Sequence, residues 1–163
     1  MGNVILTPRL RLRQVSSEEA AEVLQGRQDP ERPWIEGYPI EGTLDAARGF
    51  LFGVRSGIDH GDFGMYQIVR LEDGRVVGDI GFHGPPAPDR SVMIGYGLAP
   101  RARSHGYATE ALRALVHWSL SAGGAALVRA DTLLDNVASQ AVMERAGMRT
   151  AGDDDQLRHY VYP

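Results

Sequence analysis

The spacing of apolar residues along the chain alternates between the two-residue period of strands and the longer period of helices. Apolar and charged residues alternate from residue 6 to residue 13, which predicts a half-buried strand that starts after Pro8. The segment Glu72-Asp-Gly-Arg75 predicts a tight hairpin between two further strands. The predicted strands span residues 6–13, 65–71, 76–82, 91–98, 127–133 and 157–162.

Four segments have the 3.6-residue spacing of amphipathic helices. The first ends at residue 25, the second at about residue 55, and the third at Gly123-Gly124, while Gly147 in the left-handed conformation ends the fourth. Small polar residues commonly start helices because their side chains accept hydrogen bonds from free backbone N–H groups. The residues predicted to start or cap these helices are Ser16 or Ser17, Thr43 and Asn136. The apolar positions of the fourth helix are Ala138, Ala141 and Val142.

Composition narrows the class of protein. The chain has 163 residues, enough for one domain with a proper core spanning 1–163 and too few for two. It has no Cys, and its five His residues never recur at i, i+4 spacing, so we expect neither disulfides nor an acyl-cysteine intermediate nor a metal centre. The formal net charge is −4 and the 17 basic residues are dispersed, which argues against a nucleic-acid partner. No apolar run is long enough to span a membrane, and we expect a cytoplasmic protein.

The junction between the strand at 91–98 and the helix after it is the clearest candidate for a binding site. A helix start leaves N–H groups without partners and carries the positive end of the helix dipole, so it attracts anions. Gly106 allows close approach of the backbone to a bulky anion, and Arg101 and Arg103 add positive charge. The junction therefore suits a phosphate or pyrophosphate, although a simple strand-to-helix bend with solvated arginines explains the same residues.

The segment Arg103-Ser-His-Gly106-Tyr-Ala108 resembles the R/Q-x-x-G-x-G/A element of the GCN5-related N-acetyltransferases, whose backbone amides hold the pyrophosphate of acetyl-CoA. The predicted order of elements, β-α-α-β-β-β-α-β-α-β-β, is also the order of that family. The resemblance implies an α+β fold with a mixed central sheet of about seven strands and four helices. It places the phosphate-binding loop between the fourth strand and the third helix, and it implies acetyl-CoA as the cofactor. The residues implied in cofactor binding are Leu98, Arg101, Arg103, Ser104, His105, Gly106, Tyr107, Ala108, Thr109, Asn136 and Ser139.

A second segment, which begins at Asp135-Asn136, resembles the N-x-x-S-x-x-x-x-x-x-x-G-F sequence of the subgroup that acetylates ribosomal-protein N-termini. Its ending is Gly147-Met148, where that subgroup has Gly-Phe. The resemblance implies that Asn136 and Ser139 reach the pantetheine and phosphate region of the cofactor. Asn136 is also explained as a helix cap and Ser139 as an ordinary first-turn residue, and the two roles are compatible.

The resemblance also implies that a neutral amine attacks the thioester carbonyl directly, with acetyl-CoA held against a splayed pair of strands. Relatives often carry a Glu where this chain has Met93, and a Tyr that protonates the leaving thiolate where it has Met143. No carboxylate occurs in 91–98, so His83 and Tyr96 are the nearest substitutes for the base and the acid. A lone strand His or Tyr is more often a packed residue, and a water relay or an already neutral amine is the competing route.

In this fold the loop that holds Trp34 and Tyr38 overhangs the acceptor site, and Asp29 and Glu31 in the same loop suit a cationic amine. Trp34 is also explained as a residue that fills a gap beneath the loop. The acceptor expected is a small amine or a peptide N-terminus. Two other classes of protein stay open: a catalytically inactive acyl-CoA sensor or interaction module, and a nucleotide-binding domain that uses the same helix start. A homodimer is a further expectation.

Overall fold

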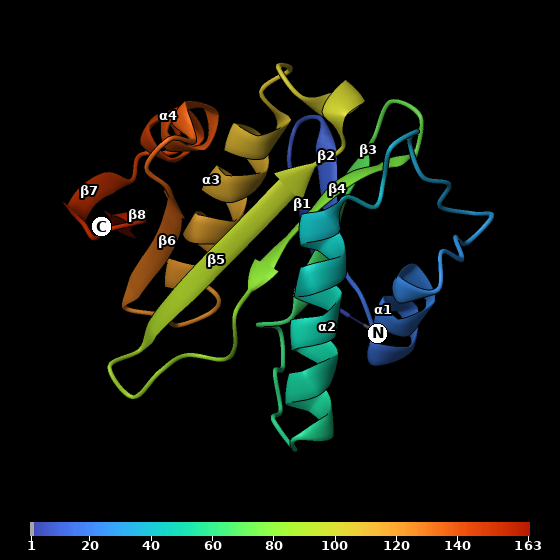
Figure 1. Cartoon of the computed structure of the whole chain (residues 1–163). Helices are drawn as coiled ribbons and strands as arrows, with labels where there is room; N and C mark the ends of the chain where they lie inside the picture. Colours follow the sequence, from blue (N-terminus) through green and yellow to red (C-terminus); the bar gives the residue numbers. More distant parts are fainter. Residues whose placement is uncertain (1) are drawn as a thin grey trace.

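One mixed sheet of eight strands organises residues 2–163, the part of the chain that the computed structural model describes (Figure 1). The strands lie in the order β1-β2-β3-β4-β5-β6-β8-β7. Neighbours are antiparallel except β5 and β6, which are parallel. The strands are β1 (Val4–Leu6), β2 (Leu10–Gln14), β3 (Met65–Arg70), β4 (Val76–Phe82), β5 (Ser91–Leu98), β6 (Leu127–Leu133), β7 (Arg149–Asp153) and β8 (Leu157–Tyr162).

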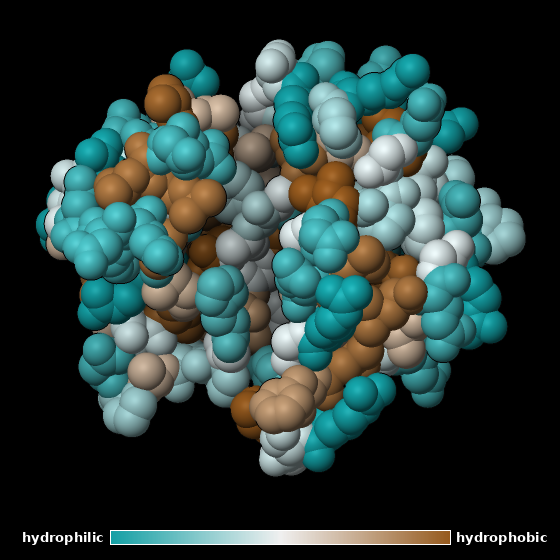
Figure 2. Space-filling model, viewed as in Figure 1, coloured by the Kyte–Doolittle hydropathy of each residue, from teal (hydrophilic) through white to brown (hydrophobic). Residues whose placement is uncertain are grey.

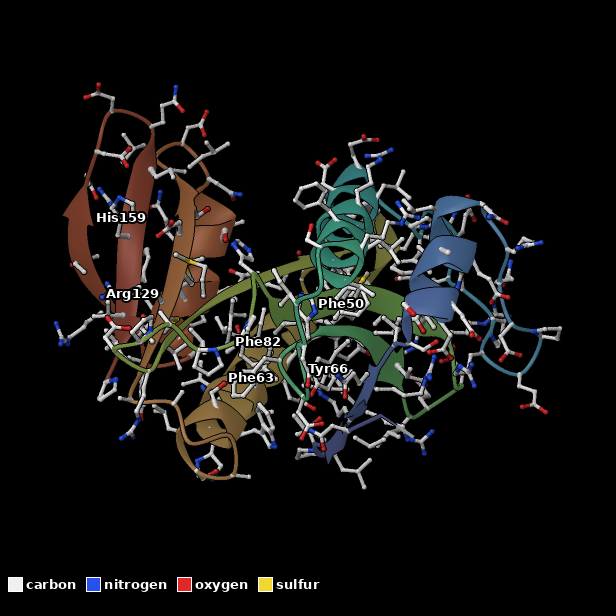
Figure 3. All side chains as sticks on the ribbon, turned by 90° about the horizontal axis from the view of Figure 1, so that it is seen from below. Phe50, Phe63, Tyr66, Phe82, Arg129 and His159 are labelled. Carbon is white, nitrogen blue, oxygen red and sulfur yellow. The ribbon has the colours of Figure 1, made fainter. Side chains whose placement is uncertain are left out.

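Helices cover both faces of this sheet. Helices α1 and α2 lie on one face and α3 on the other, as the view in Figure 3 shows, and α4 contacts α3 and β6. The largest apolar core lies between the sheet and α3, where Leu112 and Leu115 are fully buried. No helix within residues 2–163 has the length and hydropathy needed to cross a bilayer. The helices are α1 (Ser17–Leu24), α2 (Glu41–Arg55), α3 (Tyr107–Leu120) and α4 (Val137–Arg145), with a short 3-10 turn η1 (Pro100–Ala102).

The predicted α+β fold with four helices is confirmed, and the described sheet has one strand more than the seven or so expected. The predicted strand at 6–13 is two strands, because the chain turns at Pro8 and Val4–Leu6 pairs back on β2. A three-residue edge strand is too short to show a two-residue period in the sequence. The loop implicated in phosphate binding consequently follows the fifth strand of the chain.

The starts of α1 and α2 differ in how they are capped. Ser16 caps α1 as predicted: its Oγ accepts a hydrogen bond from the N–H of Glu19 at 3.1 Å, and the Glu19 carboxylate accepts one from the N–H of Ser16 at 2.7 Å. The prediction for Thr43 was wrong, because α2 begins two residues earlier and Ile40 occupies its cap position without a side-chain hydrogen bond. Thr43 lies inside the first turn, fully buried, and its hydroxyl donates to the Asp79 carboxylate.

Helix α4 is capped as predicted but buries a different face. The Asn136 carboxamide oxygen accepts from the N–H of Ser139 at 3.1 Å, and Gly147 has the left-handed φ of 95°. The predicted apolar face is wrong at Ala138, which is exposed, whereas Gln140 and Met143 are buried. Gln140 is buried without penalty because its amide donates to the carbonyl oxygens that end β6.

Candidate active site

Two hollows meet beside the middle of β5. The α2 cavity, of about 480 Å³, lies between α2 and strands β4 and β5. The β5–β6 cleft, of about 320 Å³, lies between β5, β6 and α4. Figure 2 shows the molecule hollowed between α2 and the C-terminal strands. Both hollows are lined by His83, Gly95 and Tyr96, so a molecule in one can reach a molecule in the other at these residues.

The β5–β6 cleft exists because the two parallel strands diverge. Their residues pair only from Ser91 to Met93, and no pair joins β5 to β6 beyond Met93 in the described residues. On its other side β5 continues to pair with β4 as far as Leu98. The second half of β5 therefore presents one edge of its backbone to the cleft, where N–H and C=O groups are available to a bound molecule. The predicted splayed strand pair is present.

The loop after β5 forms an open cradle at the start of α3. Ser104 and Gly106 have left-handed φ angles of 66° and 81°, and no side chain within residues 2–163 caps the helix. The first N–H groups of α3, from Tyr107 to Thr109, therefore lack intrahelical acceptors. A Cβ on Gly106 would lie 3.2 Å from the Arg9 guanidinium, and the φ angle itself disfavours other residues. These features suit a pyrophosphate group, and the binding role of the loop stays a prediction from the sequence.

Two exposed side chains of the loop make contacts that hold it in place. The Arg103 Nε donates to the carbonyl oxygen of Leu98 at 3.2 Å, and the His105 ring lies 5.5 Å from that of Tyr107 in a stacked arrangement. Arg101 is mostly exposed and lies 3.4 Å from the Glu36 carboxylate. Of the two arginines, Arg103 therefore ties the loop to the end of β5, and Arg101 remains at the surface.

A residue distant in sequence also holds this loop. Arg9, from the turn between β1 and β2, donates from Nη1 to the His105 carbonyl at 2.9 Å and from Nε to the Glu110 carboxylate at 2.8 Å. Its guanidinium lies 4.7 Å from the centre of the Tyr107 ring. The Thr7 hydroxyl donates to the same carboxylate at 2.6 Å. The sequence analysis did not identify this cluster, because only the fold brings residues 7–9 next to residues 105–110.

Tyr96 and Ser139 meet across the β5–β6 cleft. Their hydroxyl oxygens lie 2.8 Å apart, and the Tyr96 hydroxyl also donates to the Ser139 carbonyl oxygen at 3.2 Å. Burial raises the pKa of Tyr96 to about 12, so the phenol is protonated at neutral pH. Asn136 and His83 line the same cleft. The fold thus brings together four of the predicted site residues that are far apart in the sequence.

Asp79 is a site residue that the sequence analysis missed. Its carboxyl lines the α2 cavity and is only 4% exposed. The Thr43 hydroxyl donates to Oδ2, and Oδ1 accepts no hydrogen bond from residues 2–163. Burial raises the pKa of Asp79 to about 7, against the opposing effect of the Thr43 hydrogen bond. A single acidic residue inside the apolar and glycine-rich run 76–82 was the available signal in the sequence.

Trp34 and Tyr38 line neither hollow. Their rings pack edge to face at 5.5 Å, in a cluster with Val69, Val76 and Ala99. Burial and the nearby Asp79 charge raise the pKa of Tyr38, whose hydroxyl is buried without a partner among the described residues. Neither aromatic residue lines the α2 cavity. Their assignment to the acceptor stays a prediction, and the packing of Trp34 in this cluster matches the alternative explanation, a residue that fills a gap.

Comparison with known proteins agrees with this geometry. Residues 9–149 match the sequence profile of the acetyltransferase (GNAT) domain family. The uncharacterized N-acetyltransferase YoaA of Bacillus subtilis is 28% identical over 168 residues, covering 99% of this chain and 90% of YoaA. YjdG of the same organism, also described as an uncharacterized N-acetyltransferase, is 29% identical over 100 residues, 61% of this chain and 60% of YjdG.

Solved structures share the fold. A putative ribosomal-protein-serine acetyltransferase from Vibrio cholerae superposes with a TM-score of 0.67 at 19% identity, covering 99% of both chains. Mycobacterium smegmatis RimJ, solved in complex with CoA-disulfide, superposes with a TM-score of 0.65 at 21% identity, covering 98% of this chain and 87% of RimJ. The resemblance seen in the sequence is confirmed, and the chain belongs to the acetyltransferase (GNAT) domain family, whose members use acetyl-CoA.

Proposed function

We propose that this chain transfers the acetyl group of acetyl-CoA to a neutral primary amine in the α2 cavity, with Asp79 as the group that accepts the amine's proton. The observation that carries this proposal is the position of Asp79. Its free Oδ1 belongs to a cavity that meets the β5–β6 cleft at Gly95 and Tyr96. An amine beside Asp79 is thereby directed toward the cleft in which the thioester would lie.

Acetyl-CoA, when bound, supplies the thioester whose acetyl group is transferred. The cradle at Gly106 and the free N–H groups from Tyr107 to Thr109 would hold its pyrophosphate. Asn136 and Ser139 line the cleft and would contact the arm that follows. The unpaired edge of β5, including the N–H of Leu98, supplies donors to orient and polarise the reacting carbonyl.

Two protein groups manage the protons of this reaction. Asp79, whose pKa of about 7 matches neutral conditions, exists partly as a carboxylate that takes a proton from the bound ammonium or amine. Thr43 fixes Oδ2 and leaves Oδ1 for the acceptor. On the other side of β5, the hydroxyl pair of Tyr96 and Ser139 donates a proton to the leaving sulfur. His83 lies where the two hollows meet and positions the acceptor or a water between them.

The catalytically inactive alternative rested on the missing carboxylate in 91–98 and the missing Tyr at Met143. Asp79 supplies a carboxylate from β4, the strand beside β5, and Tyr96 supplies a phenol in the cleft. The family assignment gives the inactive alternative no support. A cytoplasmic location and a homodimer stay predictions from the sequence.

The test is acetyl transfer measured by thiol release, with Asp79→Asn compared against wild type from pH 5.5 to 9. We expect Asp79→Asn to lower kcat/KM by roughly 10²-fold or more, the usual effect of losing a general base. The inflection of the wild-type profile near pH 7 should disappear, and acetyl-CoA affinity should stay unchanged. Asp155→Asn, at an exposed carboxyl far from the cavity, is the matched control.

His83→Ala separates this proposal from the base predicted from the sequence. With Asp79 as base, His83→Ala slows the reaction but keeps the inflection near pH 7. An inflection that persists in Asp79→Asn and vanishes in His83→Ala would assign the base to His83. An inflection that follows the pKa of each amine tested, in all variants, would show that no protein base is used.

A further inference from the structure

We infer that the acceptor is a small monoamine with an apolar, aromatic body, and that Gly49 of α2 sets the size of the body that fits. The inference rests on the proposed function, because it takes the α2 cavity to be the acceptor site. It adds the chemical class of the acceptor and a residue that determines specificity. Three features of the cavity support it: space at Gly49, the nature of the walls, and the number of unpaired charges.

The first feature is a glycine that packing does not require. A Cβ built on Gly49 meets no atom within 4 Å, whereas one on Gly97, across the cavity, would lie 2.7 Å from Ile40. A side chain at 97 would therefore require the Ile40 side chain to shift, and one at 49 would displace nothing. Glycine inside a helix is less stable than alanine, so packing within the helix does not explain Gly49. Gly49 lines the cavity and is exposed, so this space lies at the open side of the cavity.

The second feature is the character of the walls. The Phe50 and His60 rings line the cavity together with Gly49, and they lie 4.8 Å apart in a tilted pair. Phe50 lies on the α2 side of the sheet, whereas Phe82 lies on the α3 side with Phe63 (Figure 3). Aromatic rings gain from offset or edge contacts with another ring, so this wall favours an aromatic body. The apolar and aromatic side chains on this wall are Phe50, His60 and Met65, whereas the side chains of Ile80, Phe82 and Tyr96 belong to the core on the α3 face of the sheet.

The third feature is the charge available to the acceptor. Two carboxylates line the cavity, and the exposed one, Asp45, accepts a hydrogen bond from Arg48 at 3.0 Å. Of these two carboxylates, only Asp79 has no cationic partner among the described residues. The cavity therefore offers one carboxylate to pair with one ammonium group of the acceptor. A polyamine or an aminoglycoside would place further ammonium groups against apolar walls, where each is strongly disfavoured.

A peptide is disfavoured by the same walls. Its backbone N–H and C=O groups need partners when they leave water. Strand β4 pairs with β3 on one side and β5 on the other, so it offers no free edge for an added strand. On the α2 side, Ala46, Gly49 and Phe50 offer no side-chain hydrogen-bond partner for these groups. The cavity therefore favours a small molecule with one amine over a peptide N-terminus.

The experiment measures kcat/KM for four acceptors: 2-phenylethylamine, ethylamine, spermidine and a hexapeptide with a free N-terminus. Wild type is compared with Gly49→Leu, which fills the open space, and with Gly49→Ala, which adds one methyl and the same helix stabilisation. We expect wild type to prefer 2-phenylethylamine. Gly49→Leu should lower kcat/KM for it by about tenfold or more and leave ethylamine and the acetyl-CoA Kd unchanged, while Gly49→Ala stays close to wild type.

The outcomes separate this inference from the proposed function. If no amine is acetylated, the proposed function fails. If amines are acetylated but spermidine or the peptide exceeds 2-phenylethylamine, the acceptor class is wrong and the proposed function stands. If Gly49→Leu lowers kcat/KM equally for ethylamine and 2-phenylethylamine, or for neither, Gly49 does not set the size. Equal melting temperatures of the two Gly49 variants exclude misfolding as the cause.

Discussion

Replacing the buried Asp79 by Asn should make the protein more stable at alkaline pH while inactivating it. Burial raises the pKa of this carboxyl from 3.8 to about 7 in the folded protein. In the unfolded chain the group ionises near its ordinary value. Between about pH 4 and 7 the folded state holds a proton that the unfolded state has released, so stability falls as pH rises through this window. Above pH 7 the full cost of the buried charge is present.

The magnitude follows from the displacement of the pKa. A tenfold change in an ionisation constant corresponds to about 1.4 kcal/mol, so moving from 3.8 to about 7 costs the folded state about 4 kcal/mol once the group is ionised. Asn does not ionise, and its carbonyl oxygen can accept the same hydrogen bond from Thr43. We therefore expect Asp79→Asn to exceed wild type in stability by about 4 kcal/mol at pH 8.5 and by about 2 kcal/mol at pH 5.

Urea unfolding at the two pH values, followed by tryptophan fluorescence, gives the free energy of unfolding for each protein. At each pH the free energy of unfolding of wild type is subtracted from that of Asp79→Asn. This difference is then compared between pH 5 and pH 8.5, so the effects of other titrating groups cancel. A difference that is equal at both pH values, or an Asn variant that is less stable at pH 8.5, refutes a buried carboxyl with a raised pKa. Thr43→Val is the companion variant: without its hydrogen bond, which lowers the pKa of Asp79, the activity inflection should move above pH 7.

Three further outcomes are expected at the cradle and at the far edge of the sheet. Gly106→Asp should abolish the thermal stabilisation that acetyl-CoA gives to the folded protein, because it adds a side chain and a negative charge to the pyrophosphate cradle. Arg9→Ala should raise KM for acetyl-CoA and leave kcat at saturation unchanged. Arg9→Lys should not restore KM, since a compact ammonium lacks the planar guanidinium that reaches Glu110 and His105 through separate nitrogens and lies over the Tyr107 ring. Hydrogen bonds to Asp131 and Asp154 raise the pKa of His159 in the folded protein. Protonated His159 therefore stabilises the fold in acid, and this stabilisation is lost as pH rises through the raised pKa. His159→Gln should lower the urea midpoint at pH 5.5 and leave it unchanged at pH 9.

The fold was predictable from the sequence wherever local signals and packing agree. Strands β4, β5, β6 and β8 occupy the predicted residues, because each is an apolar run between turn-forming residues. The cap at Ser16 and the left-handed Gly147 follow from backbone chemistry that acts over a few residues. Local rules failed at Thr43, a good cap by type, because the buried Asp79 needs its hydroxyl inside the helix. Tertiary contacts override a preference of this size.

The cradle at the start of α3 was predictable from the sequence, and the α2 cavity was not. The cradle is one continuous segment, so its glycine, its arginines and the helix start can be seen together in the sequence. The brace from Arg9 and the pairing of Tyr96 with Ser139 join residues about one hundred and about forty positions apart, which only the sheet order brings into contact. Trp34 and Tyr38 were assigned to the acceptor by loop position alone, and this assignment stays a prediction because the two rings pack with Val69, Val76 and Ala99 and line neither hollow.

The position of Asp79 shows that the strand beside β5 can bring a carboxylate to the α2 cavity. The sequence analysis looked for a carboxylate only within residues 91–98, which form β5. In the antiparallel pair β4–β5, Asp79 lies directly opposite Gly97, and residues paired in this way point to the same face of the sheet. A side chain at 97 would require Ile40 to shift, because its Cβ would lie 2.7 Å from the end of the Ile40 side chain. With Gly97 at this position, strand β4 presents a carboxylate on the face where β5 has no side chain. A carboxylate on either strand of the pair faces the same acceptor, so its absence from one strand is no evidence of lost catalysis.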